Sequence, residues 1–531
     1  MTSALLAGLL SIVTAGCGPR DGPAGAAESQ TTLRVGFGLS NSTSSESGIR
    51  QVVQNILAEA LVSLGDDGHS APWLAQGWDE SPDGLTWRFQ LRPDVRFHDG
   101  TPLTASEVVT VLTNQLPRFM GRAFEDVESI RAVDDHEVEI VLHDRSTFLL
   151  EALSLPIVKA GSIGTGPFVL DDELNSTMKM RAFASYHSGK PTVDEIEIRP
   201  YSSIRSAWAD LLRGEVDMLY EVGAETLDSL RESSQVSIHI AERAYAYVVI
   251  FNLKKPRLQG SAFRRGLSAA VDRHALVADG LDGLGTVADA PVWPRHWAYD
   301  PELPRFTFDP TPLDVSRTDG PLTLVFAEQA HERMVLMVQR QLHAVGVEVV
   351  PELAPIDEVM TKVMNGDFDL FFADAGLGPT LLRAGLFWRS GSLPFNVGGY
   401  SNHEVDAALD SIRRARDEQS YRTGVAAFQR AIVEDPPGIF LAWSQRARAV
   451  STRFEVPVEP GRDILSTLRL WRPVVGRAGA GAPAAMREPR IGGSEARASA
   501  EAKRRGWAAF AEARASVAEA ARRPGPGATK E

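Results

Sequence analysis

The stretch that decides the fold runs from Leu74 to Leu116 and reads LAQGWDESPDGLTWRFQLRPDVRFHDGTPLTASEVVTVLTNQL. Residues 81–84 (SPDG) are typical of a tight turn, because proline presets φ at one position and glycine accepts positive φ at another. Trp87, Phe89 and Leu91 then alternate with polar residues, which is the pattern of a half-buried strand. These local signals predict a turn followed by a strand.

A capped helix follows that strand. Thr104 is a suitable N-cap, and Glu107 three residues later completes the sequence of a capping box. Leu103 and Val108 stand where a hydrophobic staple would pack across the helix start. Arg92-Pro93-Asp94 and His98-Asp99-Gly100 break the chain between the strand and this helix, so the stretch predicts the order strand, double turn and helix.

The same stretch resembles the signature of the family-5 extracytoplasmic solute-binding proteins, the dipeptide, oligopeptide and nickel receptors of ABC importers. The match is long, gapless and mixed in residue type. Residues 164–168 (GTGPF) and 399–406 (GYSNHEVD) resemble further motifs of that family. The resemblance implies an α/β, two-lobed fold of the periplasmic-binding-protein type II kind, in which two crossover strands join the lobes. It also implies that ligand is held in a cleft between the lobes.

Composition fits an ordinary soluble globular chain that is large enough for two or three domains. The 531 residues are 44% hydrophobic and 23% charged. The net charge of −14 argues against nucleic acid or an anionic membrane surface as a partner. The single cysteine, Cys17, excludes an intrachain disulfide.

The position of Cys17 resembles a lipoprotein signal peptide. A short apolar run, residues 4–13, precedes Thr14-Ala15-Gly16-Cys17, and a stretch rich in glycine, proline and alanine follows. The segment before Leu5 has no lysine or arginine, and Thr14 stands where leucine or valine is usual. We expect residues 1–17 to be a signal peptide lipidated at Cys17 and residues 18–30 to be a linker. The alternative is an N-terminal helix with an incidental cysteine.

The resemblance and the element patterns predict the remaining organisation. We expect lobe I over 31–252 with a subdomain at about 45–165, lobe II over 253–443, and a return to lobe I over 444–473. Residues 474–531 are rich in alanine, glycine, arginine and glutamate, which predicts a mostly disordered tail with a marginal helix from about Glu495 to Arg523.

Periodicity predicts individual elements of both lobes. Lobe I should contain a first strand at Thr32–Gly38, a helix over Ile49–Leu64 and a closing strand at Leu465–Trp471. The crossing strands should lie at Tyr245–Leu253 and Leu441–Val450. Lobe II should contain a helix over Phe263–Val277 and a βαβ unit, with strands at 322–326 and 347–353, a helix over Arg333–Val345, a helix over Asp357–Met364 and a strand at Phe368–Phe372.

Asp374 is the candidate ligand-binding residue with the clearest chemistry. In the peptide receptors an aspartate in a Trp-x-x-Asp stretch pairs with the ligand's α-ammonium, and the matching residues here are 371–374 (FFAD), with phenylalanine in place of tryptophan. A desolvated ammonium requires a carboxylate, which would exclude ligands without that charge. We expect Asp374 to stand just past the carboxyl end of its strand. The alternative is that Asp374 caps the following loop.

Other candidates for the cleft are less specific. Dipeptide receptors hold the ligand's carboxylate with an arginine early in lobe II, and residues 322–328 contain no arginine or lysine. A longer peptide held by backbone hydrogen bonds, or a cationic non-peptide, therefore fits better than a dipeptide held at both ends. Asn252 is expected near the hinge, and Trp388, Asn396 and Asn41 could line the cleft, although surface or core packing is open for each.

We expect no enzyme activity, no cofactor and no metal. The histidines, His296, His331, His343 and His403 among them, form no HxxH or HExxH spacing, and no G-x-S-x-G elbow or Walker loop is present. A nickel chelate, another cationic solute or an oligosaccharide remains open as the ligand, as does a hydrolase, a sensor or a scaffolding role on this fold. The expected partners are a peptide or small solute and an ABC permease, for an extracytoplasmic, monomeric and lipid-anchored protein.

Overall fold

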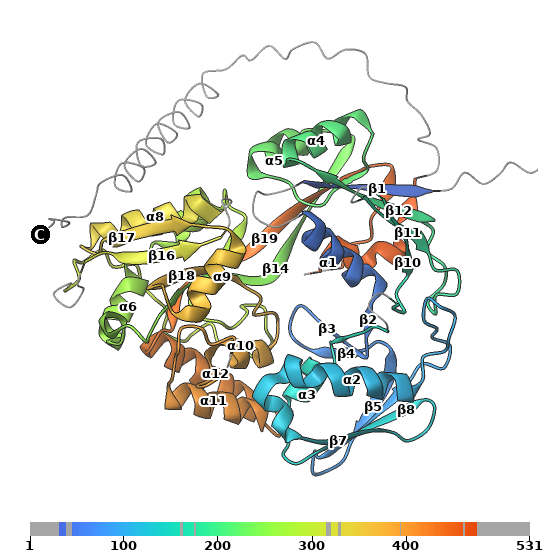
Figure 1. The fold of residues 1–531 in the computed structure, drawn as a ribbon, viewed down its shortest axis with the longest axis horizontal. Helices are drawn as coiled ribbons and strands as arrows, with labels where there is room; N and C mark the ends of the chain where they lie inside the picture. The colour runs from blue at the N-terminus through green and yellow to red at the C-terminus, as the bar shows by residue number, and fades with distance from the viewer. Residues whose placement is uncertain are drawn as a thin grey trace, which may run out of the picture.

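The computed structural model describes residues 31–38, 45–159, 163–174, 177–314, 320–327, 331–392, 394–459 and 462–474. They form two α/β lobes and a smaller unit, which lie at the top, the left and the bottom of Figure 1. The expectations for Cys17, Asn41 and the tail helix lie outside the described residues.

One mixed sheet extends through both lobes, in the order β10-β11-β12-β1-β13-β19-β14-β18-β16-β17, with β15 beside β19. Its lobe I half is centred on β1, which alternates buried and partly exposed residues as its sequence predicts and pairs in parallel with β12 and β13. The elements of this half are β1 (Thr32–Gly38), α1 (Ser45–Leu57), β10 (Phe168–Leu174), β11 (Thr177–Ala182), β12 (Glu195–Tyr201), α4 (Ile204–Arg213), β13 (Met218–Leu219) and α5 (Ala224–Arg231).

Two long antiparallel strands connect the lobes, as expected. They are β14 (Val236–Phe251) and β19 (Gly438–Ser451), and they pair from Val236–Ser451 at one end to Ile250–Gly438 at the other. In Figure 1 they run side by side from the upper lobe to the left-hand lobe. Strand β14 begins well before its expected start and β19 extends past both of its expected limits, so one ladder, with register shifts between Glu242 and Ala246 and between Tyr247 and Val248, joins the two halves of the sheet.

Lobe II contains the expected βαβ arrangement. Strand β16 lies parallel to β17 and β18, and helix α9 ends at Gly366, whose φ of 77° is the left-handed conformation that glycine accepts. The elements of this lobe are η2 (Pro256–Leu258), α6 (Ser261–Ala269), α7 (Arg273–Ala275), η3 (Leu276–Gly280), β15 (Gly285–Val287), β16 (Leu322–Phe326), α8 (Glu332–Ala344), β17 (Val349–Leu353), α9 (Ile356–Asn365), β18 (Leu370–Ala375), α10 (Leu381–Trp388), α11 (His403–Arg413) and α12 (Glu418–Glu434).

The smaller unit confirms the local reading of the fold-deciding stretch. Trp87, Phe89 and Leu91 are buried on β6, and the Thr104 side chain accepts a hydrogen bond from the Glu107 amide at the start of α2. The elements are β2 (Glu59–Ala60), β3 (Val62–Leu64), β4 (Ser70–Pro72), β5 (Ala75–Glu80), β6 (Thr86–Leu91), α2 (Ala105–Met120), η1 (Gly121–Asp126), β7 (Val127–Ala132), β8 (Glu137–Leu142), α3 (Phe148–Ala152) and β9 (Pro156–Ile157).

This unit is inserted between α1 and β10 of lobe I but also packs against lobe II. The buried Glu151 carboxylate on α3 accepts hydrogen bonds from the Leu382 amide, at 2.8 Å, and from the Tyr421 hydroxyl, at 3.1 Å. Asp126 pairs with Arg413 at 2.8 Å. Both contacts are made with helices of lobe II, so the small unit bridges the two lobes. The residue limits assigned above to the lobes stay a prediction.

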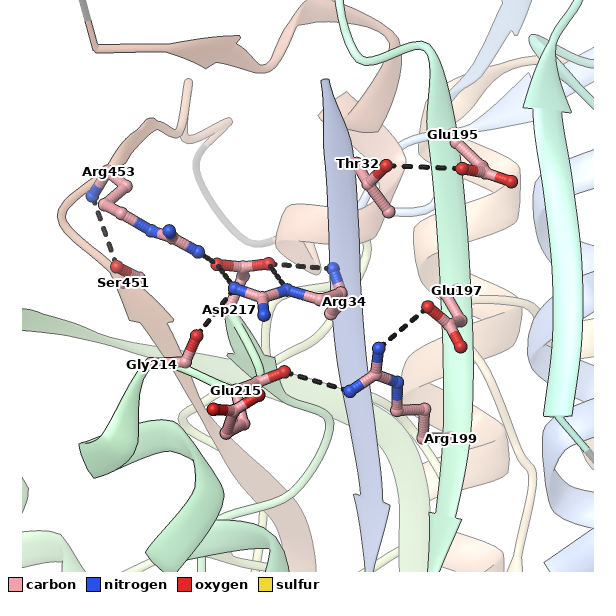
Figure 2. A network of polar contacts seen from close by, with 10 residues as sticks. All are labelled: Thr32, Arg34, Glu195, Glu197, Arg199, Gly214, Glu215, Asp217, Ser451 and Arg453. Carbon is pink, nitrogen blue, oxygen red and sulfur yellow. Dashed lines mark hydrogen bonds and ion pairs between the residues drawn. The ribbon is translucent and has the colours of Figure 1, made fainter. Parts of the chain in front are cut away.

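A buried carboxylate fixes the end of the second crossing strand to lobe I. Asp217, beside β13, is fully buried and accepts hydrogen bonds from the Arg34 amide at 3.0 Å and from the Arg34 Nε at 2.8 Å. Arg453, just past β19, also pairs with Asp217 (Figure 2). The network therefore joins the first strand of lobe I to the returning chain.

Three element expectations were wrong. Leu465–Trp471 is not a strand: η5 (Ile464–Leu470) is a 3-10 helix that buries Ile464 and Leu468 on one side and precedes β21 (Arg472–Pro473), which pairs with β20 (Phe454–Glu455). The helix expected over Ile49–Leu64 ends at Leu57, where the Leu57 carbonyl accepts from Gly166 outside the helix. The helix expected over Phe263–Val277 breaks after Ala269, because the Asp272 side chain caps a new turn.

Replacing Asp217 with alanine should destabilise lobe I. The change leaves the Arg34 and Arg453 guanidiniums, which are 21% and 48% exposed, without their shared carboxylate, and losing a hydrogen bond to a charged group costs about 1.5–3 kcal/mol. Chemical denaturation followed by circular dichroism measures the loss. Asp228→Ala is the control, since that side chain is 82% exposed; equal midpoints for the two variants would contradict the role of Asp217.

Burial raises the pKa of the Glu151 carboxyl from 4.5 to about 7. The folded protein therefore binds a proton more tightly than the unfolded chain, and this contribution to stability is lost as the pH rises from about 5 through 7. Glu151→Gln should reduce that pH dependence and raise the free energy of unfolding at pH 8 by up to about 3 kcal/mol.

Thermal unfolding between pH 5 and pH 8 tests this expectation. Glu125→Gln is the control, because the Glu125 side chain is 72% exposed. A Glu151→Gln profile parallel to the wild-type profile would contradict the assignment.

Candidate ligand-binding site

Strand β14 carries a bulge where the two lobes meet. Strand β14 pairs with β19 up to Glu242–Gln445 and again from Ala246–Trp443. Residues 243–245 of β14 therefore lie opposite a single residue of β19, Ser444. Pairing with β18 begins at Ala246–Ala375. A bulge re-aims the side chains it carries, and this one releases Arg243 and Tyr245 from the regular ladder at the end of β18.

Arg243 forms an ion pair with Asp374. The Arg243 Nη1 donates to the Asp374 Oδ2 at 3.3 Å, and about one fifth of each side chain is exposed. The guanidinium also lies 4.2 Å from the centre of the Tyr245 ring. Asp374 pairs with Tyr247 inside β18, so the expectation that it stands past the end of its strand was wrong.

The second carboxylate oxygen of Asp374 lacks a partner. Its Oδ1 is buried and accepts no hydrogen bond from any described residue. A buried acceptor without a donor costs free energy, more so when it carries charge. The site is therefore complementary to a ligand that brings an N–H donor, and a positively charged donor would gain most.

A second ion pair completes the cluster. Arg446 on β19 lies with its Nε 3.8 Å from the Oε1 of Glu221, which follows β13 in lobe I. Burial lowers the pKa of Arg446, but Glu221, Tyr220 and Asp374 outweigh burial and hold it above its ordinary value. Together Arg243, Asp374, Arg446 and Glu221, which we call the charge quartet, bring two positive and two negative charges to the lobe junction.

Aromatic side chains surround the charge quartet. The ring centre of Tyr247 lies 5.3 Å from that of His331 and 6.0 Å from that of Phe372. Burial, and then the charge of Asp374, raises the pKa of Tyr247. On the lobe I side, Tyr220 stacks on Phe37 at 4.8 Å. Aromatic surface therefore lies beside the quartet on both the lobe II and the lobe I side.

The other expected ligand contacts that the structure describes serve the protein interior instead. The side-chain amide of Asn252 donates to the Gly366 and Phe368 carbonyls, and its side-chain oxygen accepts from the backbone amide of Lys254. Asn396 likewise bonds to backbone groups, including both the amide and the carbonyl of Tyr400. Trp388 is 2% exposed and lies in the core beside Phe440. We therefore propose none of the three as a ligand contact.

Sequence reasoning missed three of the four quartet residues. The signal available was a charged pair, Glu242-Arg243, inside the mostly apolar sequence of β14. Charges in such a strand need a local reason, since buried strand positions disfavour them. Arg446 stands in a similar place on β19.

Three further features concern the described part of the chain. There, histidine, cysteine and acidic side chains form no group of three or more that could hold a metal ion. An open pocket of about 440 Å³ lies at the junction of the small unit and lobe I, lined by residues such as Trp73, Arg462 and Arg469, and it shares no residue with the quartet. No described helix has the length and apolar character needed to span a membrane.

Comparison with known structures agrees with the fold. A nickel–histidine complex of NikZ from Campylobacter jejuni aligns with a TM-score of 0.71 and 20% identity, over 83% of this chain and 99% of that one. AppA from Bacillus subtilis, in complex with a nonapeptide, aligns with a TM-score of 0.70 and 22% identity, over 84% of this chain and 99% of that one.

Sequence comparison identifies the family. The oligopeptide-binding protein AppA of Bacillus subtilis is 24% identical over 486 residues, which cover 82% of this chain and 89% of AppA. The glutathione-binding protein GsiB of Pectobacterium atrosepticum is 26% identical over 456 residues, covering 76% of this chain and 86% of GsiB. The family model described as bacterial extracellular solute-binding proteins, family 5 middle, matches residues 70–392, more than half of the chain. The chain therefore belongs to the family-5 bacterial extracellular solute-binding proteins.

Proposed function

We propose that this protein is the solute receptor of an ABC importer and that it captures a peptide or similar small solute at the charge quartet. The observation that carries the proposal is the buried, unpartnered Oδ1 of Asp374 at the junction of the lobes. Within a family of solute-binding proteins, such an acceptor is a suitable partner for the cationic group of a ligand.

The position of the quartet suggests how binding is linked to lobe movement. Asp374 belongs to a lobe II strand and Glu221 to a lobe I segment, while Arg243 and Arg446 come from the two crossing strands. A ligand that contacts both sides stabilises the closed arrangement by its differential affinity for that state. The permease would then recognise the closed receptor.

The relatives suggest two ligand classes. Some are named as binding proteins for oligopeptides, glutathione or D,D-dipeptides, and another as a nickel-binding protein. Lobe II offers no arginine or lysine at the described residues 322–327 for a ligand carboxylate. A peptide held mainly through its ammonium and backbone fits this arrangement, and a cationic non-peptide solute is the second candidate.

The proposal includes no chemical conversion. The relatives are named as binding proteins, and the quartet itself consists of carboxylates and guanidiniums. Incubation with a peptide library, followed by mass spectrometry, distinguishes the receptor from a hydrolase on the same scaffold. Retention of intact peptides supports the receptor, whereas multiple-turnover cleavage would overturn it.

Asp374→Asn should weaken binding of an ammonium-bearing solute by about tenfold or more, because the charge-assisted bond is replaced by a neutral one. Isothermal titration with a solute selected from the peptide library measures the change. Asp171→Asn is the matched control, since that carboxylate lies in an exposed pair with Arg181. Equal affinity for the Asp374 variant and the wild type would refute the ligand role of Asp374.

We also propose that the protein acts outside the cytoplasmic membrane and is anchored there through a lipid on Cys17. The apolar run and small residues before Cys17 support this proposal. Cys17→Ser should abolish incorporation of labelled palmitate and move the protein from the membrane fraction to the soluble fraction. Unchanged fractionation and labelling would contradict the anchor, while leaving the solute-binding proposal intact.

A further inference from the structure

We infer that the charge quartet selects solutes with an α-amino acid head group, that is, a free ammonium and a free carboxylate on one carbon atom. This inference rests on the proposed receptor function and narrows its ligand class. It begins from Arg243 and Asp374, whose opposite charges lie next to each other on neighbouring strands.

The separation of the two charges sets the spacing of a complementary ligand. Because the Arg243 Nη1 and the Asp374 Oδ2 are 3.3 Å apart, a ligand that contacts both groups needs its own opposite charges equally close together. An α-amino acid head group has that spacing. In an α-linked peptide the carboxylate is farther from the ammonium by about 3.5 Å for each added residue, so it cannot reach Arg243 while the ammonium contacts Asp374.

Both protein groups have hydrogen-bonding capacity left while they stay paired. The Oδ1 of Asp374 has no donor among the described residues and is buried, so an ammonium reaches it only when the lobes or the side chain move. The guanidinium of Arg243 has five N–H donors, and the hydrogen bond to Asp374 uses one of them. The ligand's ammonium would bind to Oδ1 and its carboxylate to the remaining donors of Arg243. Four charges of alternating sign would then be arranged in a ring.

The charge balance of the quartet favours the same class. Its two guanidiniums and two carboxylates sum to zero, and Arg446 already interacts electrostatically with Asp374 and Glu221. A zwitterionic head group adds no net charge to this partly buried site. A lone ammonium would add one positive charge beside two guanidiniums, which is less favourable at low dielectric constant.

Two isomeric dipeptides test the inference. In γ-L-glutamylglycine the ammonium and a free carboxylate share one carbon atom, whereas in α-L-glutamylglycine that carboxylate is consumed in the peptide bond. The two isomers have the same composition and net charge. We expect the γ isomer to bind about tenfold or more tightly in isothermal titration, as a charge-assisted guanidinium–carboxylate contact would provide.

Arg243→Met should remove most of the preference for the γ isomer while keeping a side chain of similar length. Arg333→Met is the control, because Arg333 pairs with Asp282 on the surface of lobe II, with nearly half of each side chain exposed. The control should retain the wild-type preference.

Several outcomes would overturn the inference. The inference fails if the isomers bind equally, if the α isomer binds more tightly, or if neither binds at millimolar concentration. It also fails if Arg243→Met leaves the preference for the γ isomer unchanged. If peptides without the head group bind and depend on Asp374, the inference fails and the proposed function survives. If no solute of any class binds, both fail.

Discussion

The paired crossing strands are the constraint on which the rest of the structure depends. Because β14 and β19 hydrogen-bond to each other along most of their length, the two halves of the sheet meet through one ladder. The ladder is interrupted at residues 243–245, where the lobes join. An interruption at this place makes room for charged side chains in strands that carry mostly apolar residues.

The charges gathered there are arranged to offset the cost of burial. Each carboxylate of the quartet has a guanidinium neighbour, and the sum of the charges is zero. One acceptor, the Oδ1 of Asp374, is left without a donor. A buried group without a partner calls for an explanation, and a ligand that supplies the donor is one. A solute that donates a hydrogen bond to this oxygen gains the free energy of that bond. If it binds the closed arrangement of the lobes more tightly than the open one, it stabilises the closed arrangement.

Much of the fold could be predicted because its signals are local. The turn at 81–84, the alternation in β6 and the cap at Thr104 need only neighbouring residues, and all three are present. The segment at Leu465 was harder, since seven residues are compatible with either a strand or a helical turn, and the burial of Ile464 and Leu468 decides for the helix. The breaks after Leu57 and Ala269 depend on contacts with Gly166 and on the cap at Asp272.

The site was less accessible to sequence reasoning. Asp374 was identified through its motif, but its partner Arg243 lies 131 positions away and is aimed by a bulge that the local sequence marks only by the charged pair Glu242-Arg243. Asn252, Asn396 and Trp388 had the right residue types, yet burial and backbone hydrogen bonds place them in the interior. Residue type narrows the candidates, whereas register and burial decide which of them face a ligand.

Native mass spectrometry of the protein as isolated, before and after exchange into a mixture of candidate solutes, tests the central claim most directly. The account predicts a complex of one protein with one solute, whose mass is unchanged when denaturation releases it. A protein that retains no solute from any mixture, or that releases an altered one, would contradict the account.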